Sequence, residues 1–173
     1  LDPDRARALS ARMPDHVRRV GVFVDPDDAL IDMAIAAGRL DTLQLHKTAP
    51  ARIADLARRT GLESWAVIAV KTRADLDRAR DYAGAAQFIL YDAKTPDDAA
   101  LPAGMGLRFD WSLLDGFRHP LPWALSGGLD AGNVAEAIAR TGARIVDVCS
   151  GVETAPGVKD VDKITAFLKA VAQ

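Results

Sequence analysis

The stretch from Trp65 to Tyr91 decides the fold class, because it contains one complete strand–helix–strand unit. It begins with Trp65-Ala66-Val67-Ile68-Ala69-Val70, continues through an Ala- and Arg-rich segment, 72–82, and ends with Gln87-Phe88-Ile89-Leu90-Tyr91. Short aliphatic and β-branched runs are typical of buried strands, and the segment between them has helical spacing. A unit of this size predicts two parallel strands joined by a covering helix.

The same unit recurs on both sides of this stretch. Further strands are predicted at 20–24, 42–45, 123–125 and 145–149, and further helices at 3–13, 26–37, 50–60, 130–141 and 161–171. The predicted strands start at intervals of 22 or 23 residues, apart from one longer interval of about 35 residues after the fourth strand. A near-regular repeat of βα units predicts a parallel sheet covered by helices, either open or closed into a barrel.

The loop after the first predicted strand favours the barrel. An open nucleotide-binding sheet has a glycine-rich loop there, whereas this chain has the acidic string Asp25-Pro26-Asp27-Asp28. A closed (β/α)8 barrel needs eight strands, and the helix at 3–13 has no predicted strand before it. We therefore expect residues 1–173 to form a single (β/α)8 TIM barrel domain of the α/β class. Only about six βα units are represented, and the first two, at the N-terminus, are lacking.

Composition argues against several classes of partner. The 173 residues are 49% hydrophobic and 27% charged, and the formal net charge is −2, with basic and acidic residues interleaved. This balance gives no general attraction to nucleic acid or to an anionic membrane, and no apolar run is long enough to span a bilayer. A single cysteine, Cys149, forms no internal disulfide. A cytoplasmic protein is predicted.

Two glycine loops in the last third of the chain predict an anion site. Ser126-Gly127-Gly128-Leu129 and Ser150-Gly151-Val152-Glu153 each follow an apolar run, and each is expected to precede a helix. Small residues let a ligand approach the backbone closely, and N–H groups at a helix start favour a phosphate. We expect Gly127, Gly128, Ser150 and Gly151 to bind the phosphate of a small-molecule substrate. The alternative is that both loops are plain tight turns.

Asp92 is the predicted acid. It directly follows a strand and begins the longest insertion, residues 93–110, which is expected to close over a ligand. A carboxyl group that loses water at such a position has a raised pKa, which suits a general acid. The alternative is an aspartate that caps a turn beside Lys94.

Three other polar residues stand at strand ends. Asp147 lies within a predicted strand, where a buried acid needs a partner, so we expect it to face the site. His46 is predicted either to donate a hydrogen bond to the ligand or to be structural. Cys149 is expected to be a small core residue rather than a nucleophile. No metal site is predicted.

Several strings together resemble the phosphoribosylanthranilate isomerase family of tryptophan biosynthesis, and the resemblance covers the whole chain. They are Gly21-Val22-Phe23-Val24, Gln44-Leu45-His46, Leu90-Tyr91-Asp92-Ala93-Lys94, Phe109-Asp110-Trp111-Ser112, Ser126-Gly127-Gly128-Leu129 and Val146-Asp147-Val148-Cys149-Ser150-Gly151-Val152-Glu153.

The resemblance implies a (β/α)8 barrel that catalyses an Amadori rearrangement without a cofactor. The ribose ring of N-(5-phosphoribosyl)anthranilate opens to give 1-(2-carboxyphenylamino)-1-deoxyribulose 5-phosphate. Such a reaction needs an acid for the ring oxygen and a base for the proton at C2. Asp92 matches the family's acid. The family's base, a cysteine on the first strand, and its anthranilate-binding arginine belong to segments with no counterpart here, and Cys149 stands where the family usually has serine.

The sequence is also compatible with two other functions. One is a non-catalytic phosphate-binding barrel fragment, and the other is a related phosphosugar enzyme of the epimerase or indole-glycerol-phosphate synthase type. For the leading assignment, a monomer or a homodimer is expected.

Overall fold

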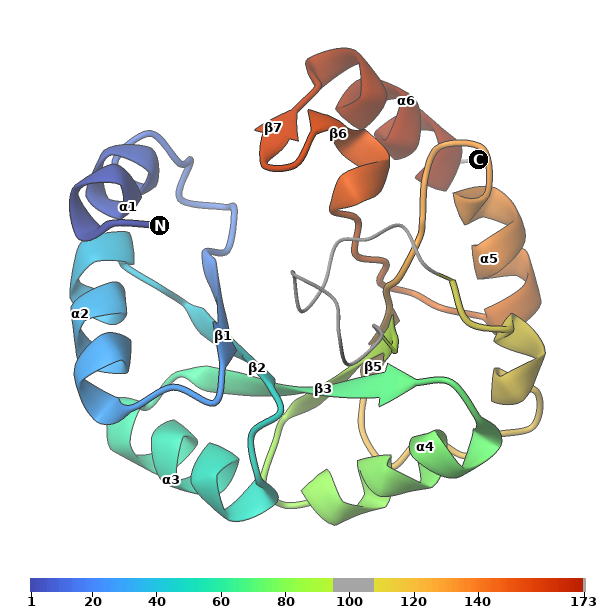
Figure 1. The fold of residues 1–173 in the computed structure, drawn as a ribbon, viewed down its shortest axis with the longest axis horizontal. Helices are drawn as coiled ribbons and strands as arrows, with labels where there is room; N and C mark the ends of the chain where they lie inside the picture. Colours follow the sequence, from blue (N-terminus) through green and yellow to red (C-terminus); the bar gives the residue numbers. More distant parts are fainter. Residues whose placement is uncertain (95–107, 173) are drawn as a thin grey trace. The chain divides into compact units, whose positions relative to one another are not determined.

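The computed structural model describes residues 1–94 and 108–172, in which strands and helices alternate along the chain (Figure 1). Five strands form one sheet in the order β1-β2-β3-β4-β5, and the pairs β1–β2, β2–β3 and β4–β5 are parallel. The strands are β1 (Val20–Val24), β2 (Thr42–His46), β3 (Glu63–Val70), β4 (Phe88–Ala93) and β5 (Trp123–Leu125). The predicted parallel α/β arrangement is therefore confirmed.

The chain divides into two compact units. The first unit comprises residues 1–67 and 81–88, and the second comprises residues 68–80 and 89–173. The helices of the first unit are α1 (Pro3–Ser10), α2 (Asp28–Gly38) and α3 (Pro50–Thr60). The elements that follow are α4 (Arg73–Asp77), η1 (Arg78–Tyr82), η2 (Trp111–Leu114), α5 (Val134–Thr141), η3 (Ser150–Val152), β6 (Glu153–Ala155), β7 (Val158–Lys159) and α6 (Val161–Val171).

The core of the first unit lies between its strands and the helices α2 and α3, which run along the same side of β1 and β2 (Figure 1). Every residue of β2 is buried, and Ile31 of α2 and Ile53 of α3 are completely buried. Removing such side chains from water is the main favourable term in folding. Local chemistry sets the helix ends: Asp27 caps α2 by accepting a 2.8 Å hydrogen bond from the Leu30 N–H, and Pro50 begins α3.

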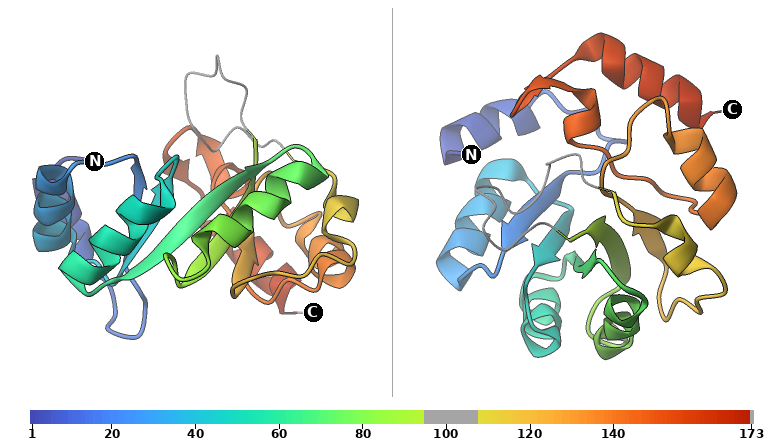
Figure 2. Two further views of the ribbon diagram at one scale, coloured as in Figure 1. Left: turned by 90° about the horizontal axis from the view of Figure 1, so that it is seen from below. Right: turned by 45° about the vertical axis from the view of Figure 1, so that its right-hand side comes forward.

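The core of the second unit is built around Tyr91 of β4, which is fully buried. The rings of Phe117, His119 and Trp123 surround it at centroid distances of 6.3, 5.5 and 5.7 Å. Farther along the chain, the antiparallel hairpin β6–β7 leads directly into α6 (Figure 2). The ring contacts hold Tyr91 in place, and the next residue of β4 is Asp92.

Some predicted elements differ from the observed ones. Predicted strand 145–149 is reduced to one isolated bridge between Val146 and Leu125, because β5 offers a partner of only three residues. Predicted helix 72–82 is divided into α4 and a 3-10 helix, and the first helix ends at Ser10. Residues 95–107 of the predicted closing loop lie outside the described residues.

None of the helices in the described part of the chain combines the length and the apolar character needed to cross a membrane.

Candidate active site

Three neighbouring chain segments in the second unit are in register at one level. Tyr91 of β4 pairs with Leu125 of β5, and Leu125 bridges Val146 in parallel. The Leu125 N–H donates to the Ile145 carbonyl oxygen at 3.0 Å. Because parallel segments in register place equivalent side chains on the same face, the residues that follow these three meet at the carboxyl ends of the strands. In (β/α) barrels, this is the edge where chemistry takes place.

The three residues brought together in this way are Asp92, Ser126 and Asp147. The Ser126 N–H donates to the carbonyl oxygen of residue 91, and the Asp147 N–H donates to that of residue 125, both at 2.8 Å. The Ser126 hydroxyl donates to Oδ2 of Asp147, also at 2.8 Å. Ser126 is buried, and both aspartates are half-buried. Two carboxyl groups and one hydroxyl group thus lie together in a site that is partly shielded from water.

The site changes the proton affinity of Asp92. Burial, followed by the negative charge of Asp147, raises the pKa of Asp92 from 3.8 to about 6. Hydrogen bonds from the Ala93 N–H and the Ser126 hydroxyl favour the carboxylate and offset part of this increase. A carboxyl group with this pKa is still partly protonated near neutral pH, so it can deliver a proton and take one back.

The first glycine loop packs directly against Asp92. Gly127 has a φ of +90°, and a Cβ atom there would lie 2.6 Å from the Ala93 nitrogen and 3.0 Å from Oδ1 of Asp92. Only glycine fits this backbone conformation and this space. The adjacent Gly128 has a φ of +62°. Within residues 1–94 and 108–172, the N–H groups of Gly127 and Gly128 donate to no acceptor.

The second glycine loop lies against the first. A Cβ atom at Gly151 would stand 2.0 Å from the carbonyl oxygen of Leu129 and 3.1 Å from Cα of Asp130. Ser150 and Gly151 therefore sit directly beside the segment that follows Gly128. The structure brings together six of the seven residues predicted as site residues in one part of the second unit, and His46 is the exception.

The expectation that a helix begins at Asp130, directly after the first glycine loop, is wrong. After Leu129 the chain makes a turn in which Asp130 accepts from the Gly132 N–H at 2.8 Å, and α5 begins only at Val134. An aspartate that binds nearby backbone competes with helix formation, which explains the later start. Ser150 begins a three-residue 3-10 turn that leads into a hairpin. An anion bound at these loops would therefore be bound by the N–H groups of the loops and not by those of an α-helix.

Two further predicted residues have different outcomes. His46 lies in the first unit, buried at the end of β2, with its Nε2 atom 3.3 Å from Nε2 of Gln44. The expectation that Cys149 is a core residue is wrong, because it is exposed. The ammonium group of Lys159 lies 3.4 Å from its sulfur and donates to its carbonyl oxygen at 2.9 Å.

Sequence reasoning missed the role of Ser126. It appeared there only as the first residue of a glycine loop. The signal that could have found it is its position one residue beyond a predicted strand, the same position that singled out Asp92. What the sequence does not give is the register that sets Ser126 beside Asp147.

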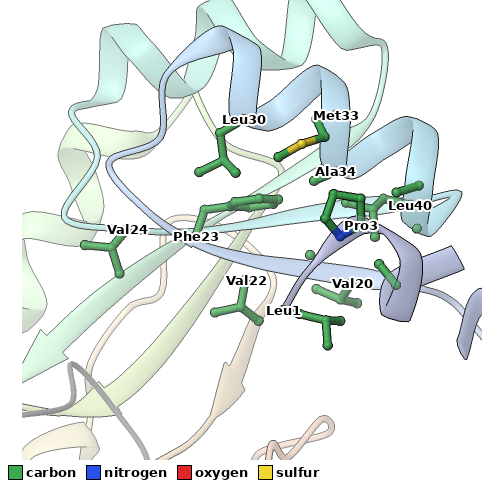
Figure 3. A pocket seen from close by; sticks show the side chains of 14 residues that line it. Leu1, Pro3, Val20, Val22, Phe23, Val24, Leu30, Met33, Ala34 and Leu40 are labelled. Atoms are coloured by element: carbon green, nitrogen blue, oxygen red, sulfur yellow. The ribbon is translucent and has the colours of Figure 1, made fainter.

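A separate pocket lies in the first unit, between α1, β1 and α2 (Figure 3). Its volume is about 510 Å³, and its lining side chains are apolar, including those of Val22, Phe23, Leu30 and Met33. None of its lining side chains can donate or accept a proton, so this pocket is not the reaction site.

Comparison with known proteins identifies the family. The family model of N-(5'-phosphoribosyl)anthranilate isomerase matches residues 3–170. The isomerase of Zymomonas mobilis subsp. mobilis is 52% identical over 174 residues, which cover 99% of this chain and 81% of that protein. The isomerase of Paramagnetospirillum magneticum is 50% identical and covers 98% of this chain and 80% of that protein.

Solved structures agree. The crystal structure of the isomerase of Thermotoga maritima matches with a TM-score of 0.87 and 34% identity, over 99% of this chain and 81% of that one. The predicted fold class, an α/β (β/α)8 barrel, is confirmed by this match. The chain belongs to the N-(5'-phosphoribosyl)anthranilate isomerase family.

Proposed function

We propose that Asp92 is the general acid of the isomerase reaction and that the two glycine loops hold the phosphate of the substrate. The activity is that of the family, the isomerisation of N-(5'-phosphoribosyl)anthranilate in tryptophan biosynthesis. This aldose–ketose rearrangement requires a proton on the ribose ring oxygen as the bond between C1 and that oxygen breaks. The observation that carries the proposal is the place of Asp92 beside Ser126 and Asp147 at the carboxyl ends of the strands, where burial and the charge of Asp147 raise its pKa.

The surroundings of Asp92 support a role as proton donor. Asp92 is half-buried, and the neighbouring charge of Asp147 disfavours its ionised form. It therefore holds a proton at a pH where an exposed aspartate has lost it. Once the ring has opened, the same carboxylate remains beside the substrate, where hydrogen bonds from Ala93 and Ser126 stabilise its charge.

The loop geometry supports phosphate binding. The two consecutive N–H groups of Gly127 and Gly128, on residues with positive φ, form the kind of backbone concavity that binds anions. Ser150 adds a hydroxyl group, and Gly151 lets its loop approach the first. A solved isomerase that matches this chain with a TM-score of 0.83 and 33% identity binds reduced 1-(o-carboxyphenylamino)-1-deoxyribulose 5-phosphate, whose 5-phosphate fits such a site. Asp147 and His46 stay predicted as substrate-binding residues.

Replacing Asp92 with asparagine tests the acid. Asp92→Asn keeps the size and removes the transferable proton, so kcat is expected to fall by about two to four orders of magnitude. Steady-state kinetics with N-(5'-phosphoribosyl)anthranilate provides the measurement. Asp162→Asn is the matched control, because Asp162 is exposed on α6 and should leave turnover unchanged. Near-normal turnover of Asp92→Asn would overturn the proposal.

Three broader expectations complete the proposal. Both compact units belong to one barrel domain, which is supported by the alignment of 99% of the chain with a single solved isomerase. The enzyme is a monomer or a homodimer, and the isomerase of Thermotoga maritima is described as dimeric. A cytoplasmic location is in keeping with a biosynthetic enzyme.

A further inference from the structure

The Ser126 hydroxyl lies between two carboxyl groups but has only one proton to donate. In the structure it donates to Oδ2 of Asp147 at 2.8 Å. Ser126 also lies beside Asp92, because Tyr91 pairs with Leu125 on the neighbouring strand, and its hydroxyl favours the ionised form of the Asp92 carboxyl group. A hydroxyl group accepts through its lone pairs while it donates, so a protonated Asp92 can donate to Ser126 while Ser126 donates to Asp147. When Asp92 is ionised, it needs a donor instead.

The backbone holds the hydroxyl in this position. The Ser126 N–H is bonded to the carbonyl oxygen of Tyr91 at 2.8 Å, and the side chain is only 7% exposed. The next residue, Gly127, packs directly against Ala93 and Asp92. Rotation about one side-chain bond is therefore the freedom that Ser126 retains, and it moves only the direction of the hydroxyl proton.

We propose that Ser126 is a positioning residue for the acid: its hydroxyl donates to Asp147 while Asp92 carries its proton, and turns to Asp92 once that proton has left. This inference rests on the proposed role of Asp92. It explains how one site can hold the acid protonated before the transfer and stabilise the carboxylate after it.

The step balances without a further reactant. The proton of Asp92 moves to the ribose ring oxygen as the bond between that oxygen and C1 breaks, and the electron pair of the bond stays on the oxygen. The anilino nitrogen supplies the pair that forms the iminium group. Ser126 keeps its own proton throughout and only changes the acceptor to which it donates.

Other charged side chains do not explain the raised pKa of Asp92. Among the described residues, Asp147 is the charged side chain that acts on Asp92. Lys94, two residues farther along, acts on Asp75 instead. Lys71, at the end of β3, is exposed, and its N–H also binds Asp75 at 3.0 Å. The segment 126–127 contributes no ionisable side chain.

Two substitutions should shift the pKa of Asp92 in opposite directions. Ser126→Ala removes the donor that favours the carboxylate, so the pKa should rise. Asp147→Asn removes the negative charge that raises the pKa of Asp92 and leaves a weaker acceptor for the Ser126 hydroxyl, so the pKa should fall. The pKa is measured directly by carboxyl 13C NMR titration, with Asp92→Asn assigning the resonance, and independently from the pH profile of kcat/KM.

Kinetics supply the second readout. Ser126→Ala is expected to lower kcat by about tenfold with little change in KM, because the hydroxyl acts in the transfer rather than in binding. Ser126→Thr retains a hydroxyl and should restore most of the loss. Ser112→Ala is the matched control: it removes a serine hydroxyl that binds Asp110 on the surface, and it should move neither the pKa nor kcat.

Each outcome decides the matter. An unchanged pKa of Asp92 in folded Ser126→Ala, or shifts of the same sign in both variants, would overturn the role of Ser126 while leaving Asp92 as the acid. Normal turnover of Asp92→Asn would instead overturn the proposed function itself. If Ser126→Ala does not fold, Ser126→Cys, which replaces the hydroxyl with a weaker donor of similar size, decides by whether the pKa of Asp92 rises.

Discussion

Burial and two residues that are distant in sequence together set the proton affinity of Asp92. Asp147 and Ser126 lie 55 and 34 positions away, yet both act on its carboxyl group. The larger effect is burial, which disfavours a charge that cannot be solvated. At the scale of single residues, burial, one charge and two hydrogen bonds together set the pKa of one carboxyl group. Gly127, which has no side chain, lets the first glycine loop pack against Asp92.

Replacing Gly127 should destabilise the fold, because both its backbone conformation and its surroundings require glycine. Gly127→Ala forces a Cβ atom to within 2.6 Å of a backbone nitrogen at a φ of +90°, so we expect a loss of roughly 2–4 kcal/mol in the free energy of unfolding. Urea denaturation is the measurement. Gly157→Ala is the control, because its φ of +79° is similar but nothing lies within 4 Å, so only about 1 kcal/mol should be lost. Equal losses for both variants would contradict the steric argument.

At the scale of elements, the second glycine loop depends on the hairpin that follows it. Lys159 of β7 donates to Oε1 of Glu153 at 2.8 Å and to the carbonyl oxygen of Cys149 at 2.9 Å. The Asp160 N–H donates to the carbonyl oxygen of Val152 at 2.9 Å. The hairpin therefore contacts the 3-10 turn that contains Ser150 and Gly151, and it supports the second glycine loop.

The contact between the two loops should decide phosphate affinity. Gly151→Ala places a Cβ atom 2.0 Å from the Leu129 carbonyl oxygen and must push the loops apart. We expect inorganic phosphate and the reduced 5-phosphate product analogue to bind at least about tenfold more weakly, measured by calorimetry. Gly132→Ala is the control, because its nearest contact is 3.2 Å, to the end of the Asp130 side chain. Unchanged phosphate affinity in folded Gly151→Ala would place the anion site elsewhere.

At the scale of the whole molecule, ionisable groups give opposing contributions to stability. Hydrogen bonds from Arg52 to Asp28 and from Lys159 to Glu153 hold the pKa of these carboxyl groups below their ordinary values. Their contribution is present above the unfolded pKa values near 4 and is lost as the pH falls. Asp92 behaves in the opposite way: because its folded pKa is raised, its ionisation destabilises the protein as the pH rises from about 4 to about 6.

The unfolding free energy should therefore respond to Asp92→Asn. The wild-type protein should lose about 2 kcal/mol from this group between pH 4 and pH 7, and the asparagine variant should not. Urea denaturation across this range is the measurement. The variant should thus be the more stable protein at neutral pH even though it is the less active one. A pH dependence identical to that of the wild type would show that Asp92 ionises at an ordinary pKa.

Several strands and helices could be predicted directly from the sequence. β1, β5, α3 and α6 have the predicted bounds, because apolar runs, a first-turn proline and an aspartate cap act over a few neighbouring residues. The family also followed from the order of short strings along the chain. The α5 start at Val134 could not be predicted this way, because the turn made by Asp130 and Asn133 competes with the helix.

The sequence by itself determined the alternation of strands and helices, the parallel sheet and the identity of Asp92 and the glycine loops as candidates. These features depend on local periodicity and on residue type, both of which are evident from the sequence itself. Only the tertiary structure decided that Ser126 joins Asp92 to Asp147 and that Gly151 lies against Leu129. Proton affinity and loop contact depend on register between segments far apart in the chain, and pairing of segments is a property of the folded molecule alone.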